Sequence, residues 1–125
     1  MKVKCVKFYN EVTKQYQDSS SWLTKGKEYI ILELEIDAGK DILYRLVGDN
    51  SDQSPGLYDS RQFEVVSEKL PSNWIIHQVK SGLLNIGPKP WQEPGFWEDC
   101  YDHDPKALEI YKREARIIYE EENAL

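Results

Sequence analysis

Short strand-like segments fill the first 70 residues, and this feature limits the possible folds more than any other. Between Tyr29 and Ile36, apolar residues occupy positions 30, 32, 34 and 36, and glutamates occupy positions 33 and 35. An alternation with a period of two is typical of a strand with one face in water. Four further segments rich in β-branched, aromatic or aliphatic residues lie at 3–8, 42–47, 56–58 and 63–66. Turn-forming residues separate these segments, so we expect five short strands that close into a small barrel without free sheet edges.

The chain changes character near residue 70, and we expect two parts. The first part, 1–70, holds the barrel, a long polar loop at 10–26, and one helical turn at 59–62 that Asp59 or Ser60 caps. The second part, 71–125, begins with a β-hairpin whose strands at 74–79 and 83–86 flank Lys80-Ser81-Gly82. Residues 87–105 show no clear period and hold four of the six prolines, so we expect a loop that its aromatic residues pin to the barrel.

A C-terminal helix is the clearest local prediction. Asp104 is a good N-cap, Pro105 suits the first helical position, and the apolar residues between 106 and 122 lie on one arc. Three glutamates at 120–122 oppose the helix dipole, so we expect that end to fray. The predicted fold class is therefore mainly β, with a barrel, a hairpin, a long loop and a C-terminal helix packed on the barrel.

Charge and composition exclude several functions. The 125 residues include 16 Lys and Arg against 22 Asp and Glu, a net charge of −6. An acidic chain of this kind is a poor ligand for nucleic acid or for anionic lipid. We interpret the lysines at 2, 4 and 7 as protection of an edge strand. No apolar run approaches the roughly 20 residues that span a membrane, and no secretory signal pattern is present, so a cytoplasmic location is expected.

An acidic segment interleaved with aromatic residues is the main candidate for binding. Residues 93–104 contain five carboxylates and neither Lys nor Arg. Aromatic side chains beside charges are favoured at protein interfaces, although a solvated loop with one helix cap would explain the charges equally well. The predicted partner-binding residues are Trp91, Glu93, Phe96, Trp97, Glu98, Asp99 and Asp102.

Enzymatic chemistry is the minority interpretation. A group of four residues lies within five positions, but its spacing matches no closed metal site, and a metal-dependent hydrolase at His103 is a remote alternative; the four are Cys100, Asp102, His103 and Asp104. The two histidines have no nucleophile context, and no glycine-rich phosphate loop is present. We expect no metal, no cofactor and no catalytic residue. Cys5 and Cys100 are expected to be reduced thiols.

Three stretches of the first part resemble the bacterial and phage Src-homology-three-like barrels. These stretches are LTKGKEYIILE at 23–33, YRLVGD at 44–49 and LYDSRQFEVV at 57–66. The resemblance covers roughly residues 1–67 and implies a fold. It implies little about function, because such barrels have many roles.

A second resemblance involves the tail. The segments IGPKPW at 86–91 and EPGFWEDCYDHDP at 93–105 resemble the tail of small immunity proteins from bacterial polymorphic-toxin and contact-dependent inhibition systems. The resemblance implies a non-enzymatic protein that neutralises a cognate toxin domain, often a nuclease with a basic cleft, by tight binding. Immunity surfaces differ between pairs, so no site residue is transferred from this likeness. The alternative is a phage or host adaptor whose barrel binds a peptide or nucleic acid.

Overall fold

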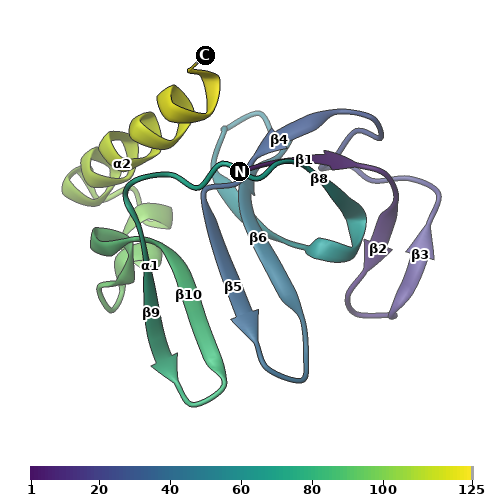
Figure 1. The fold of residues 1–125 in the computed structure, drawn as a ribbon, viewed down its shortest axis with the longest axis horizontal. Helices are drawn as coiled ribbons and strands as arrows, with labels where there is room; N and C mark the ends of the chain where they lie inside the picture. Colours follow the sequence, from purple (N-terminus) through teal and green to yellow (C-terminus); the bar gives the residue numbers. More distant parts are fainter. Residues whose placement is uncertain (125) are drawn as a thin grey trace.

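The computed structural model describes residues 1–124, and it is mainly β with a C-terminal helix (Figure 1). Leu125, the last residue of the predicted second part, lies outside the described residues. The strands are β1 (Lys2–Cys5), β2 (Phe8–Asn10), β3 (Gln15–Gln17), β4 (Glu28–Ile30), β5 (Glu33–Asp37), β6 (Ile42–Val47), β7 (Pro55–Asp59), β8 (Phe63–Ser67), β9 (Trp74–Lys80) and β10 (Leu83–Pro88). The helical elements are η1 (Ser60–Gln62), η2 (Lys89–Gln92), α1 (Phe96–Tyr101) and α2 (Pro105–Asn123).

Within residues 1–124 the strands form three antiparallel sheets, and none of these sheets closes on itself. Their strand orders are β4-β1-β8, β7-β6-β5-β10-β9 and β2-β3. The expected closed barrel is therefore not observed. The chain passes from the first sheet to the second between β4 and β5, where the Ile31 amide donates to Met1 and the Leu32 amide donates to Arg45. Consecutive strands thus lie in different sheets, and the second edge of β5 pairs with the hairpin instead of with β4.

The hairpin of β9 and β10 is part of the main sheet. β10 pairs with β5, with Leu84 opposite Ile36, so the five-stranded sheet takes strands from both sides of residue 70. Gly82 has φ +83° at the turn, as the sequence predicts. Gly87 leaves room for a neighbour, because a Cβ there would lie 2.8 Å from Cγ of Glu33.

The described residues form two hydrophobic clusters. One lies between the strands of the first part and includes the fully buried Val3, Ile31 and Leu46. The other lies between the main sheet and the helices and includes Leu32 and Ile118. Trp74 packs against both clusters, and its Nε1 donates to the Leu32 carbonyl at 3.0 Å.

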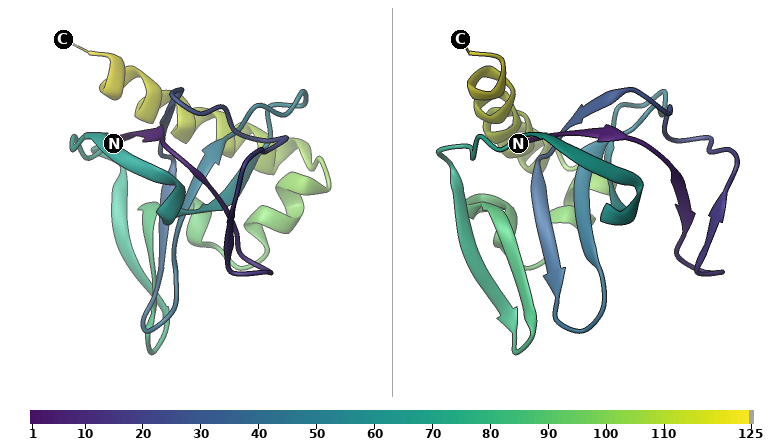
Figure 2. Two further views of the ribbon diagram at one scale, coloured as in Figure 1. Left: turned by 90° about the vertical axis from the view of Figure 1, so that its right-hand side faces the viewer. Right: turned by 45° about the vertical axis from the view of Figure 1, so that its right-hand side comes forward.

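Both of the long loops expected from the sequence contain regular structure. The 10–26 segment includes β3, which completes a small hairpin with β2 at the opposite end of the molecule from α2 (Figure 2). The 87–105 segment contains η2 and α1. A helix of six residues is too short to show a period in the sequence, so the loop prediction was wrong there.

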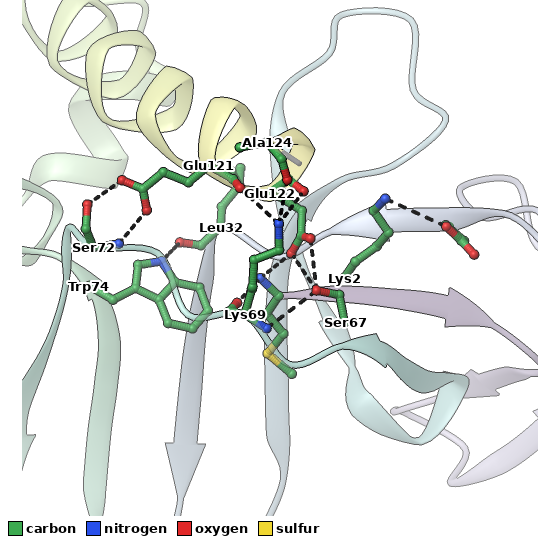
Figure 3. A network of polar contacts seen from close by, with 11 residues as sticks. Lys2, Leu32, Ser67, Lys69, Ser72, Trp74, Glu121, Glu122 and Ala124 are labelled. Atoms are coloured by element: carbon green, nitrogen blue, oxygen red, sulfur yellow. Dashed lines mark hydrogen bonds and ion pairs between the residues drawn. The ribbon is translucent and has the colours of Figure 1, made fainter.

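The C-terminal helix begins as expected and ends differently. The Asp104 side chain accepts from the Ala107 amide at 2.9 Å. At the other end, Lys69 Nζ donates to the carbonyls of Glu121, Glu122 and Ala124 (Figure 3). A cation at the last carbonyls stabilises a helix. The helix extends through the three glutamates to Asn123.

The glutamates that were expected to destabilise this end are themselves paired. The Met1 amine lies 2.7 Å from Oε1 of Glu122, and Ser67 Oγ donates to the same carboxylate (Figure 3). The side chain and the amide of Ser72 both donate to Glu121. Within residues 1–124, no helix combines the length and the apolar character that crossing a membrane requires.

Candidate functional site

The seven predicted binding residues lie on one continuous segment, from η2 to the end of α1, and they divide into two groups. Trp91 and Phe96 are buried, with 2% and 6% of their surface exposed, and Trp97 is half-buried. The carboxylates of Glu93, Glu98, Asp99 and Asp102 are exposed; we call these four side chains the acidic α1 surface. The aromatic group therefore supports the segment, and the acidic group faces solvent.

The four carboxylates of the acidic α1 surface have no cationic partner. Among residues 1–124, no ion pair within 4.0 Å involves any of them. Glu98 and Asp99 lie in the first turn of α1, where negative charge is favourable next to free backbone amides. Asp104, the fifth carboxylate of the segment, caps α2 and is engaged there. The other four carboxylates thus face solvent without a cation in contact among the described residues.

Aromatic packing fixes α1 against α2. The ring of Trp91 stacks on Phe96 at 6.4 Å and on Tyr111 of α2 at 5.5 Å between centroids. Trp97 meets Trp91 edge-on at 5.2 Å and Tyr111 at 6.0 Å. Aromatic pairs in these geometries each contribute roughly 0.5–1.5 kcal/mol beyond the area they bury. The helix that carries the carboxylates therefore has a rigid base.

A buried charge pair joins α1 to the main sheet. Glu33 on β5 and Arg45 on β6 are directly opposite in the sheet, and Nε of Arg45 lies 3.1 Å from Oε1 of Glu33. The Arg45 guanidinium lies 3.9 Å from the Trp97 ring centroid and donates to the Tyr101 hydroxyl at 3.2 Å. Gln92 of η2 donates to Oε2 of Glu33 at 2.7 Å. Both the cation and the carboxylate thus contact the segment that carries the acidic α1 surface.

Sequence reasoning missed this pair. It placed Glu33 on a wet face of its strand, whereas only 2% of Glu33 and 8% of Arg45 is exposed. The prediction of a wet face was wrong because η2 and α1 cover Glu33, and the sequence did not predict α1. Burial raises the pKa of Glu33, although the Arg45 charge and the hydrogen bonds from Gln92 and Arg45 oppose that rise. The sequence carried one signal of this ion pair, namely a glutamate in one predicted strand and an arginine in the next.

Hollows flank α1 on two sides. The first, of about 420 Å³, is lined by the carboxylates of Glu93 and Asp99, by the lysines at 89 and 106, and by apolar residues that include Phe96 and Ile110. The second, of about 460 Å³, lies between α1, α2 and the β6–β7 loop and is lined by aromatic residues that include Trp97 and Tyr111. Glu98 and Asp102 line neither hollow. The first hollow thus combines carboxylates, two lysines and apolar residues, and it can hold a protruding side chain of a partner.

The two cysteines and His103 are the residues that bear on metal or nucleophilic chemistry. Cys5 and Cys100 are both free and buried. Burial and the charge of Asp99 raise the pKa of Cys100, although Arg45 opposes the rise, so the thiol is protonated at neutral pH. Within residues 1–124, no group of three or more His, Cys, Asp or Glu side chains is placed to hold a metal ion. His103 is exposed, with φ 63° at the end of α1.

Comparisons with protein families, with curated proteins and with solved structures found no match for this chain.

Proposed function

We propose that this protein is a cytoplasmic, non-enzymatic immunity protein that neutralises a cognate bacterial toxin domain by covering its active cleft with the acidic α1 surface. The observation that carries the proposal is the set of four exposed carboxylates without cationic partners on a segment that a buried network holds in place. A helix fixed in advance loses little entropy on binding, which favours tight complexes.

The proposed mechanism is electrostatic occlusion. A nuclease cleft that binds phosphates presents Lys and Arg side chains, and carboxylates on a rigid helix would take the place of the phosphates. Long-range attraction raises the association rate. The hollow beside Glu93 and Asp99 would then take an apolar or aliphatic part of a partner side chain, which slows dissociation.

The test is a capture experiment from the source bacterium with three versions of the tagged protein. The double variant Glu98→Lys/Asp99→Lys reverses two charges of the site. The control Glu64→Lys/Glu68→Lys makes the same change of net charge at exposed positions on and just beyond β8. The proposal predicts one stoichiometric, basic protein with the wild type and with the control, and at least a hundredfold weaker binding to the site variant.

The captured protein must also behave as a toxin. Expressed alone, it should stop growth, and co-expression of the wild type or of the control variant should restore growth, whereas the site variant should fail. Capture that is equal for all three versions, or a partner that is harmless when expressed alone, would contradict the proposal.

A second candidate function is an adaptor whose first part binds a peptide, and a hollow of about 700 Å³ favours it. This hollow lies between the β2–β3 hairpin and β7, and the exposed Trp22 and Leu57 and the half-buried Tyr9 and Tyr58 line it. The proposed Src-homology-three-like relationship of residues 1–67 belongs with this candidate. If this protein is an adaptor, Trp22→Ala should abolish capture of its partner. If the partner binds the acidic α1 surface instead, the same substitution should leave capture unchanged.

A further inference from the structure

The outer edge of β9 is an unused pairing surface. β9 is the longest strand, with seven residues, and it lies at one end of the order β7-β6-β5-β10-β9 (Figures 1 and 2). Within residues 1–124, β10 is its only strand partner. The Trp74 amide donates to the Pro71 carbonyl at 3.2 Å, and the outer edge from Ile75 to Gln78 remains open to a further strand.

Other sheet edges carry the features that block such pairing. β4 has only three residues, and it begins with Glu28. β7 begins with Pro55 and ends with Asp59, and β8 carries Glu64. β9 differs, because its stretch from 74 to 78, WIIHQ, contains no proline, no glycine and no Asp, Glu, Lys or Arg. Short strands, prolines and charges are the usual protections of an edge.

The geometry of β9 defines the part that can pair regularly. Leu83 is opposite Lys80 and Leu84 is opposite Gln78, so Val79 is an extra residue and the strand bulges there. The regular stretch thus runs from Trp74 to Gln78. Its centre is Ile76, which is 71% exposed, an unusual exposure for an isoleucine in a strand.

We propose that two copies of the chain pair antiparallel along β9, with Ile76 of one copy opposite Ile76 of the other. A two-fold axis at this position places Ile75 opposite His77 and Trp74 opposite Gln78. No pair then contains two charges at neutral pH. The two five-stranded sheets become one continuous sheet, and the most exposed isoleucine is covered by its counterpart.

Charge selects a second copy as the occupant. The chain has a net charge of −6, yet residues 70–92 contain no Asp or Glu and only the cations Lys80 and Lys89. Two copies can therefore approach along this edge without bringing carboxylates together, which an approach through α1 would do. The Glu121 carboxylate lies at Ser72, just before β9, where the Ser72 amide and hydroxyl donate to it, and β9 itself offers a basic partner no carboxylate. This inference stands independently of the proposed function.

Sedimentation velocity over about 5–500 μM tests the pairing. A strand edge is a small interface, so the wild type should form a weak, concentration-dependent dimer. Ile76→Lys places two ammonium groups opposite each other and should raise the dimer Kd at least tenfold. Val66→Lys adds the same charge at a side chain that is 47% exposed on β8, and it should leave the dimer unchanged. Circular dichroism establishes that each variant is folded.

Cysteine cross-linking tests the register and the identity of the occupant. Ile76→Cys should form a disulfide-linked dimer under mild oxidation, because the two Cβ atoms face each other across the pair. Gln78→Cys should not, because in this register the two positions lie about 14 Å apart along the strands. Cys5 and Cys100 are buried and give no background.

Three results would overturn the proposal. A wild type that is monomeric at every concentration would do so, as would a dimer that Ile76→Lys leaves intact. Equal cross-linking through positions 76 and 78 would exclude the register.

Discussion

Replacing Arg45 with methionine tests the buried charge pair that joins the main sheet to α1. The substitution removes the cation that lies 3.1 Å from the Glu33 carboxylate and 3.9 Å from the Trp97 ring centroid, and it leaves Gln92 as the hydrogen-bond partner of Glu33. Removing one member of a buried pair costs about 3–5 kcal/mol, because the other charge stays buried without compensation. For a chain of 125 residues, a loss of about 4 kcal/mol lowers the melting temperature by roughly 15 °C.

The loss of stability in this variant should depend on pH. Burial already raises the pKa of Glu33, and removal of Arg45 raises it further, because that cation was the largest opposing influence. A carboxyl group whose pKa is higher in the folded than in the unfolded chain contributes stability below its unfolded pKa, and that stability is lost as pH rises through the folded pKa. The destabilisation should therefore be largest at pH 7 and smaller at pH 5.

Thermal unfolding followed by circular dichroism at both pH values measures this effect. The double variant Glu33→Gln/Arg45→Met is the control, because it removes the second charge and should recover most of the stability. A loss below about 1 kcal/mol at pH 7, or an equal loss at the two pH values, would refute the argument that Glu33 is a buried charge held by Arg45.

Two further predictions concern contacts far from α1. Trp74→Ala should cost about 3 kcal/mol, because the indole packs against both hydrophobic clusters and donates to Leu32; an unchanged urea midpoint would contradict this packing. Burial alone would raise the pKa of Glu122, but hydrogen bonds from the Met1 amine and from Ser67 outweigh burial and lower this pKa. The ionised carboxylate therefore stabilises the fold above its ordinary pKa, and this contribution is lost as pH falls below about 4.5. Glu122→Gln should thus lower stability at pH 7 and flatten the acid side of the stability curve, and an acid limb as steep as that of the wild type would disprove the assignment.

Features that depend on neighbours in the chain were predictable from the sequence. Asp104 and Pro105 predicted the start of α2, and Asp59 accepts from the Arg61 amide at 2.8 Å to begin η1 as expected. The hairpin with its turn at Gly82 was predicted for the same reason. Caps and turns involve a few adjacent residues, so their signals lie within a short window of sequence.

Features that depend on distant pairing were not predictable. Local patterns predict strands, but they do not say that β5 pairs with β10 instead of completing a barrel. The burial of Glu33 follows from α1, which is too short to be recognised, and the stability of the α2 terminus follows from Lys69, more than 50 residues earlier in the chain. The same limit applies to the site. The sequence predicted the acidic and aromatic residues, and only the structure separates the exposed carboxylates from the buried rings.

Hydrogen exchange of the α1 amides in the free protein tests the central claim most directly, which is that the acidic α1 surface exists before a partner binds. The amides of Asp99, Asp102 and His103 donate to backbone carbonyls at 2.9–3.0 Å. If the buried network holds α1 in place, these amides should exchange at least roughly a hundredfold more slowly than in an unstructured peptide. Exchange at the unstructured rate would contradict the account, because the four carboxylates would then have no fixed surface to form.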